Sequence, residues 1–177
     1  MFNDLLGEKV LLSHFVESDI TSEYISWLND PQVVRFSNQR FVCHTEKSCQ
    51  NYYDSFANSP NLFICVRTLN DNVAVGTMTA YVSPHHETVD IGIMIGRRSV
   101  WGAGVGQDAW NTLLNWFIGQ RRIRKVTAGA MRCNAPMIKL MERSGMKLEA
   151  TRSKQELLDG VPHDILYYSK FGSSDPT

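Results

Sequence analysis

The sequence predicts a single domain of the α+β, or mixed α/β, class. Its apolar residues recur alternately with the two-residue period of strands and the 3.6-residue period of helices, without a linker or an internal repeat. The length of 177 residues is typical of one domain. A hydrophobic fraction of 43% is enough for one sizeable core, which excludes disordered, collagen-like and coiled-coil chains.

The first half predicts a strand, two helices and a hairpin. Val10–Phe15 is the expected opening strand, and Asp19–Leu28 carries its apolar residues on one helical face until Asn29-Asp30-Pro31 ends it. Thr45 with Glu46 opens a second helix. Two strands then follow, Leu62–Leu69 and Val73–Val82, joined by a tight turn at Asn70-Asp71-Asn72.

The second half predicts the remaining strands and helices. Val89–Ile95 is a strand interrupted by Gly92, and Gly106–Ile118 has the period of an amphipathic helix. Arg124–Met131 is strand-like, and Asn134 is the expected cap of a helix that ends before Gly145. Within Leu157–Tyr168, Asp159-Gly160 between apolar runs is the strongest hairpin signal in the sequence.

Charge and cysteine usage exclude several classes of partner. Lys plus Arg number 18 and Asp plus Glu number 18, so the bulk charge predicts no nucleic-acid partner. No apolar run is long enough for a membrane span, and Asp4 and Glu8 within the first nine residues are untypical of a secretion signal. We therefore expect a cytoplasmic protein with no membrane partner. The cysteines, Cys43, Cys49, Cys65 and Cys133, show no zinc-binding spacing, so we expect reduced thiols and no metal.

The most informative segment is Trp101-Gly102-Ala103-Gly104-Val105-Gly106-Gln107-Asp108, between a strand and a helix. Alternate glycines let a ligand approach the backbone where the first N–H groups of the helix are unpaired, which favours a phosphate or diphosphate. Gln107-Asp108 replaces the Lys and Ser or Thr of a P-loop, which argues against a nucleoside triphosphate. The glycine spacing also departs from the dinucleotide fingerprint, which argues against NAD. A tight turn without a ligand is the alternative.

The loop lies within a longer pattern that resembles the GNAT superfamily of acyl-CoA-dependent N-acyltransferases. The family motif is Arg or Gln, two residues, Gly, one residue, then Gly or Ala; Gly104 and Gly106 match it, and Trp101 replaces the basic or amide residue. A Trp-Gly-x-Gly start is similar to the branch that contains the ribosomal-protein N-terminal acetyltransferases. Further matching pieces are Trp27-Leu28-Asn29-Asp30-Pro31-Gln32-Val33, Asp90-Ile91-Gly92, Asn134, Ser144-Gly145-Met146, and Asp159-Gly160 with Asp164.

The resemblance covers about residues 8 to 171 of a single acetyltransferase domain (1–177), followed by a short flexible C-terminal tail. It implies a GNAT-like, mostly antiparallel twisted sheet of about seven strands, two of which splay apart, with about four helices. It also implies transfer of an acetyl group from acetyl-CoA, by direct attack in a ternary complex, to a primary amine. The amine could belong to a protein N-terminus, an amino sugar or another small molecule. A homodimer is compatible with this reading.

The resemblance also assigns roles to individual residues. Coenzyme A would bind at Met94, Ile95, Gly96, Gly102, Ala103, Gly104, Val105, Gly106, Gln107 and Asn134, with its diphosphate on the loop amides and its pantetheine arm along the preceding strand. The Met94 amide would stabilise the oxyanion. Asp90 precedes Trp101 by eleven positions, the spacing of a glutamate base in the superfamily's histone acetyltransferases, so it is the expected base. The alternative for Asp90 is a structural carboxylate paired with an arginine.

Two polar segments are the expected acceptor site. Ser37, Asn38, Gln39 and Arg40 follow the first helix, and His86 lies in the loop that leads to Asp90. Arg97 or Arg98 could approach a coenzyme phosphate. Met141 occupies the position of the tyrosine that protonates the leaving thiolate in many family members, which leaves the general acid unassigned. A second hypothesis is therefore a catalytically silent acyl-CoA-binding sensor or partner module.

Overall fold

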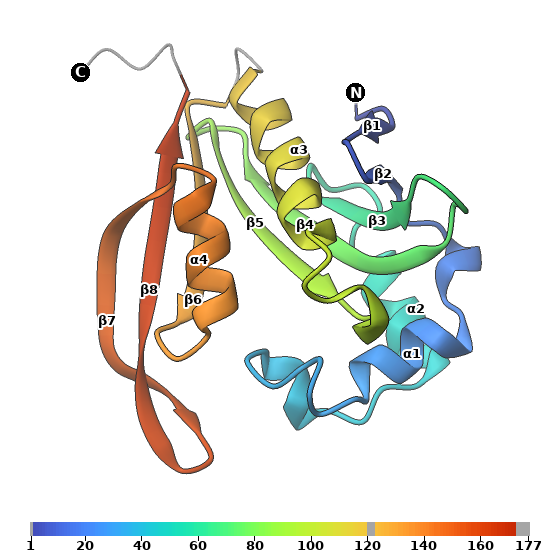
Figure 1. Ribbon diagram of the computed structural model, residues 1–177, viewed down its shortest axis with the longest axis horizontal. Coiled ribbons are helices and arrows are strands. Elements are labelled where there is room, and N and C mark those ends of the chain that lie inside the picture. Colours follow the sequence, from blue (N-terminus) through green and yellow to red (C-terminus); the bar gives the residue numbers. More distant parts are fainter. Residues whose placement is uncertain (1, 120–122, 173–177) are drawn as a thin grey trace.

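The computed structural model describes residues 2–119 and 123–172, so the expected C-terminal tail lies outside the described residues. Within these ranges the chain forms one eight-stranded sheet and four α-helices (Figure 1). The strands are β1 (Leu5–Leu6), β2 (Val10–His14), β3 (Leu62–Thr68), β4 (Ala74–Ser83), β5 (Thr88–Ile95), β6 (Lys125–Met131), β7 (Lys147–Leu158) and β8 (Val161–Phe171). The α-helices are α1 (Ser22–Leu28), α2 (Glu46–Asp54), α3 (Val105–Gly119) and α4 (Ala135–Arg143).

The strand order across the sheet is β1-β2-β3-β4-β5-β6-β8-β7. Neighbouring strands are antiparallel except β5 and β6, which are parallel. The predicted class and the mostly antiparallel sheet are therefore confirmed. The described residues contain eight strands where about seven were expected, and the two-residue β1 accounts for the difference.

Helices cover both faces of the sheet and enclose separate apolar cores. In Figure 1, α3 and α4 lie in front of the sheet, and α1 and α2 lie near the ends of β4 and β5. Trp110 and Leu113 of α3 are fully buried against one face, together with Ile64 of β3. Phe63, the neighbour of Ile64, points to the other face and packs with Tyr24 of α1. The alternation of side chains along β3 thus divides the core into two layers.

The starts of α1 and β7 differ from the predicted boundaries for identifiable reasons. Helix α1 begins at Ser22, with the Thr21 hydroxyl accepting the Tyr24 N–H at 3.1 Å, because a short 3-10 helix occupies Glu17–Asp19. Strand β7 begins at Lys147, ten residues before the predicted hairpin. This first part of the strand was not predicted from the sequence because its side chains are almost all exposed and show no apolar alternation. The predicted hairpin turn is confirmed, with positive φ angles at Asp159 and Gly160.

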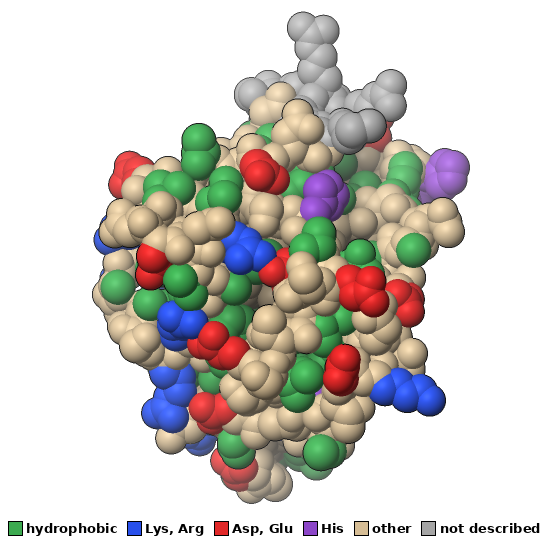
Figure 2. All heavy atoms as spheres, turned by 90° about the vertical axis from the view of Figure 1, so that its right-hand side faces the viewer, with side chains coloured by type: hydrophobic (Ala, Val, Ile, Leu, Met, Phe, Trp, Pro, Cys, Tyr) green, Lys and Arg blue, Asp and Glu red, His purple; other side chains and the backbone are tan. Residues whose placement is uncertain are grey.

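Charged residues of both signs are interspersed on the face that Figure 2 shows. This distribution agrees with the formal net charge of zero. No helix within residues 2–119 and 123–172 is long and apolar enough to cross a membrane.

The close approach of β5 to α1 predicts a large cost for a small substitution. A Cβ atom added at Gly96 would lie 2.1 Å from Trp27 Cδ2. We therefore expect Gly96→Ala to lower the free energy of unfolding by about 1–3 kcal/mol, through overpacking, in urea titrations. The control is Gly119→Ala, where the new methyl group meets nothing within 4 Å. An equal effect of the two substitutions would show that the Trp27 contact is not responsible.

Candidate active site

The central feature of the site is the early end of pairing between β5 and β6. The two strands pair only at Thr88 with Lys125, Val89 with Val126, and Asp90 with Thr127. The Thr127 hydroxyl donates to Asp90 Oδ2 at 2.7 Å, at the last paired position. Beyond this position the strands separate, as the predicted splay requires, and their facing peptide groups need other partners.

A cavity of about 1040 Å³ occupies the region where the strands diverge. It is lined by both strands, the glycine loop, the first turn of α3, helix α4 along its length, and the α1–α2 region. A smaller cavity of about 250 Å³ contains Asp90, Asn38 and Glu156 in its lining. Phe36, Gly129 and Ala130 line both cavities, so the smaller cavity adjoins the larger one.

Successive peptide groups of β5 point alternately towards β4 and into the cleft. The Gly96 amide donates to the Val75 carbonyl next to β4 at 2.9 Å. The Ile95 carbonyl accepts the Trp101 indole N–H from the opposite side at 2.8 Å. Because the antiparallel register continues without a shift, even-numbered residues of β5 direct their amides to β4 and odd-numbered residues direct theirs to the cleft.

This alternation corrects the predicted oxyanion donor. Met94 lies opposite Thr77 of β4, so its amide is directed into the sheet and not into the cleft. Met94 itself still lines the large cavity. The amides that β5 presents to the cleft belong to Ile93 and Ile95, and spacing within the sequence alone could not distinguish them from Met94.

The glycine loop presents a set of backbone donors to the large cavity. Gly102 and Gly104 have φ angles of 77° and 83°, which favour glycine. The Gly104 carbonyl accepts the Asp108 amide, so the amides of Val105, Gly106 and Gln107 belong to the first turn of α3 and have no partner within the helix. These residues all line the large cavity.

Two predicted coenzyme-binding residues lie outside the lining of this cavity. The Ala103 amide donates to the Val100 carbonyl at 3.2 Å, and the Gly96 amide is bonded to Val75. Neither amide is free for a ligand, which corrects both predictions. The other predicted residues line the cavity, namely Met94, Ile95, Gly102, Gly104, Val105, Gly106, Gln107 and Asn134.

Side chains of the loop and of α4 hold this arrangement in place. Trp101 joins the loop to the end of β5 through its bond to Ile95. The Gln107 side chain donates to Ser144 Oγ at 2.8 Å and so joins α3 to α4. Asn134 Oδ1 accepts the Met137 amide at 3.3 Å, which confirms the predicted cap. Met141 is fully buried in the main core and offers no proton donor to the cleft.

Asp90 combines access to the small cavity with a perturbed proton affinity. Desolvation raises the pKa of its carboxyl group, and the hydrogen bond from Thr127 opposes this effect. Its side chain forms no ion pair with any arginine or lysine of the described residues. The structure therefore does not support the alternative of a carboxylate paired with an arginine. A carboxylate with a raised pKa is suited to accept a proton near neutral pH.

The predicted acceptor residues divide into three groups. Ser37 and Gln39 line the large cavity, and Asn38 lines the small one. Arg40 instead donates to the Leu157 carbonyl at 3.0 Å and so links the α1–α2 connection to the β7–β8 hairpin. His86 is exposed in the turn between β4 and β5 and lines neither cavity.

Two tyrosines that the sequence analysis did not single out, Tyr24 of α1 and Tyr52 of α2, also line the large cavity. Burial raises the pKa of Tyr24 and of Tyr52, so both phenols stay protonated near neutral pH. The Tyr52 hydroxyl lies 2.8 Å from that of Tyr81, which is the cross-strand neighbour of Asp90. Helical periodicity counts tyrosine as apolar, so it carried no signal for these hydroxyl groups.

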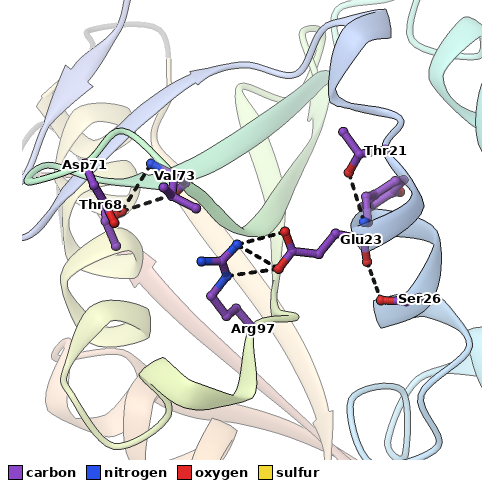
Figure 3. A network of polar contacts seen from close by, with 8 residues as sticks. Thr21, Glu23, Ser26, Thr68, Asp71, Val73 and Arg97 are labelled. Carbon is purple, nitrogen blue, oxygen red and sulfur yellow. Dashed lines mark hydrogen bonds and ion pairs between the residues drawn. The ribbon is translucent and has the colours of Figure 1, made fainter.

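The arginines after β5 form ion pairs with α1 and the turn that follows it, and Arg98 also lies over the Trp101 ring, 5.6 Å from its centroid. Arg97 forms a bidentate pair with Glu23, at 3.0 Å for Nε and 2.8 Å for Nη2 (Figure 3). Arg98 lies 3.6 Å from Asp30. Their contacts fix the end of β5 against α1 and give no support to a phosphate contact.

The described residues contain no group of three His, Cys, Asp or Glu side chains that could hold a metal ion. The four cysteines lie within the described ranges and are unpaired, and Cys49 and Cys65 are buried.

Comparisons with known proteins agree with this geometry. Among solved structures, a GNAT acetyltransferase from Bacillus anthracis matches with a TM-score of 0.81 and 19% identity over 96% of this chain and 98% of that chain. RimL, a ribosomal L7/L12 α-N-protein acetyltransferase solved with coenzyme A, matches with a TM-score of 0.84 and 14% identity over 98% of this chain and 100% of that chain. Spermidine N-acetyltransferase from Vibrio cholerae, solved with coenzyme A and spermine, matches with a TM-score of 0.82 and 14% identity over 93% of this chain and 96% of that chain. A search among curated proteins finds no match.

A family model provides the decisive comparison. Residues 9–147, more than half of the chain, match the model described as an acetyltransferase (GNAT) domain. The matched range includes β5, the glycine loop and α4, which together surround the large cavity. The chain therefore belongs to the GNAT family of acyl-CoA-dependent N-acetyltransferases.

Proposed function

We propose that this enzyme transfers an acetyl group from acetyl-CoA to a primary amine by direct attack in a ternary complex. The observation that carries the proposal is one cavity with backbone donors at two places, on the glycine loop and along the unpaired edge of β5. A diphosphate group and an arm with several amides are complementary to these two sets of donors.

The geometry supports a direction for the coenzyme. The amides of Val105, Gly106 and Gln107 would hold the diphosphate. Ile95 is the residue of β5 nearest to the glycine loop, so its amide would bind the pantetheine arm. Ile93 lies further towards Asp90, and its amide would bind the acetyl oxygen, which becomes an oxyanion during attack.

Asp90 is the proposed base for this reaction. Residues 90 and 93 are three positions apart on a strand, which corresponds to about 10 Å between their Cα atoms. A carboxylate at this distance would take the amine proton through bridging water. The amine attacks the thioester carbon, the carbon–sulfur bond breaks, and the products are an N-acetyl amide and the free thiol.

The acceptor would enter through the smaller cavity, past Asn38, and reach the part of the larger cavity that Ser37 and Gln39 line. Relatives in the same fold act on a ribosomal protein and on spermidine by their descriptions. The proposed acceptor class is accordingly a primary amine on a protein N-terminus, an amino sugar or another small molecule. The buried Met141 favours the second candidate, a silent acyl-CoA-binding module, because the family's usual proton donor is missing.

The deciding experiment measures thiol release from acetyl-CoA with peptides, amino sugars and polyamines as acceptors. Acetylation of any of these amines supports the proposed enzyme. Calorimetric binding of acetyl-CoA without any amine-dependent thiol release, and without acetylated product by mass spectrometry, would favour the silent module. Absence of binding would exclude both functions.

Strain in the glycine loop predicts a loss of coenzyme affinity. Gly104→Val places a β-branched residue at a φ of 83° and a Cβ atom 3.2 Å from Lys9 Nζ. We expect acetyl-CoA to bind at least about tenfold more weakly by calorimetry, because the loop amides must shift. Gly160→Val is a matched control, since Gly160 also has positive φ but lies in the β7–β8 turn. Equal affinities of the two variants would remove the glycine loop from the proposed coenzyme site.

Removal of the proposed base should affect turnover more than coenzyme binding. We expect Asp90→Asn to lower kcat by about 10²-fold or more, with little change in the KM for acetyl-CoA. Glu87→Gln is the control, because Glu87 is exposed in the turn before β5 and lines neither cavity. Steady-state kinetics on the best acceptor from the panel would measure both constants. A kcat within threefold of wild type would exclude Asp90 as the base.

The same carboxyl group predicts a pH-dependent gain in stability. Asp90 is an exposed residue, but partial desolvation of its carboxyl group raises its pKa in the folded state, so ionisation lowers the free energy of unfolding as the pH rises through that pKa. Asp90→Asn removes this penalty. We therefore expect the free energy of unfolding of Asp90→Asn, minus that of wild type, to be larger at pH 7 than at pH 4 in urea titrations. A stability difference that is the same at both pH values would contradict a raised pKa.

A further inference from the structure

The Lys9 side chain contacts the glycine loop, although Lys9 is about ninety residues away from the loop in the sequence. It belongs to the turn between β1 and β2. Its Nζ donates to the Ala103 carbonyl at 2.7 Å. The same atom would lie 3.2 Å from a Cβ placed on Gly104. A single ammonium group thus contacts the segment that connects β5 to α3.

The backbone of Lys9 is held on both sides. Its amide donates to Asp108 Oδ2 at 2.8 Å, and its carbonyl accepts the Leu69 amide at 3.0 Å. Asp108, in the first turn of α3, also accepts the amides of Glu8 and Val10 at 3.1 Å each. The turn is therefore fixed against α3, and only the Lys9 side chain has to be ordered to reach the loop.

The Asp108 carboxylate does not neutralise this ammonium group. It accepts three backbone N–H groups of the turn, and no carboxylate of the described residues lies within 4.0 Å of Lys9 Nζ. Lys9 therefore brings an unpaired positive charge close to the amides of the first turn of α3. Those amides are themselves the positive end of the helix dipole.

We propose that Lys9 is a positioning residue for coenzyme binding, acting through the Ala103 carbonyl. Its hydrogen bond turns this carbonyl away from the cavity, so the neighbouring amides face the diphosphate. Its charge adds attraction for the same anion. The inference rests on the proposed function, because it assumes that the loop binds the coenzyme diphosphate.

Three substitutions separate the hydrogen bond from the charge. Lys9→Arg keeps both, Lys9→Gln keeps a donor without the charge, and Lys9→Met removes both. We expect coenzyme A to bind about as tightly to Lys9→Arg as to wild type, about threefold more weakly to Lys9→Gln, and about tenfold more weakly to Lys9→Met by calorimetry. Lys47→Met is the control, because Lys47 is exposed on α2 and its side chain forms no ion pair with the described residues. Thermal unfolding of each variant would identify a general loss of folding.

A second ligand tests which phosphate is involved. Coenzyme A and 3′-dephospho-coenzyme A share the diphosphate, so Lys9→Met should weaken the binding of both by the same factor. A loss confined to coenzyme A would overturn the inference, since Lys9 would then act on the 3′-phosphate. Unchanged affinity in Lys9→Met would also overturn it while leaving the proposed function intact. Failure of the wild-type protein to bind either ligand would instead refute the proposed function.

Discussion

The loss of pairing between β5 and β6 is the constraint on which the site depends. Three paired positions hold the strands together, and beyond Asp90 and Thr127 the peptide groups of β5 face an open cleft. Backbone groups inside a fold require hydrogen-bond partners. The unpaired edge of β5 must therefore form hydrogen bonds to water or to a ligand that itself carries amide groups. A sheet that was fully paired here would have neither the cavity nor the donors. The proposed chemistry therefore begins with an interruption of regular structure.

The other parts of the site keep that interruption in a fixed shape. The Trp101 indole N–H donates to the Ile95 carbonyl, so this carbonyl has a partner on the side of β5 that faces away from β4. Gln107 links α3 to α4, and the Arg97–Glu23 pair links the end of β5 to α1. The last two contacts join segments far apart in the chain, and each joins one wall of the cavity to another. The proposed role of Lys9 extends this principle to the β1–β2 turn.

The sequence predicted the helices, the central strands and the glycine loop because their signals are local. Apolar periods, a capping Asn134 and Asp159-Gly160 act within a few residues. The identity of the free amide on β5 was predicted wrongly, since it depends on the register of β5 against β4. Strand β7 was recognised only at its end, because its exposed side chains follow no apolar period. The contacts of Lys9 and Asp108 could not be predicted, because no local pattern encodes a pairing across about a hundred residues.

The groups available in the cavity match the demands of the proposed reaction unequally. A free amine of the lysine type has a pKa of about 10.4, so its nucleophilic form must be generated by loss of a proton. A thiol has a pKa of about 8.5, so the thiolate is a stable leaving group that needs little assistance near neutral pH. Lack of a tyrosine at Met141 thus costs less than lack of a base would. The structure agrees with this ranking of a base above a proton donor. It places the Asp90 carboxyl group at the edge of the cleft, although desolvation there raises its pKa and disfavours its charged form.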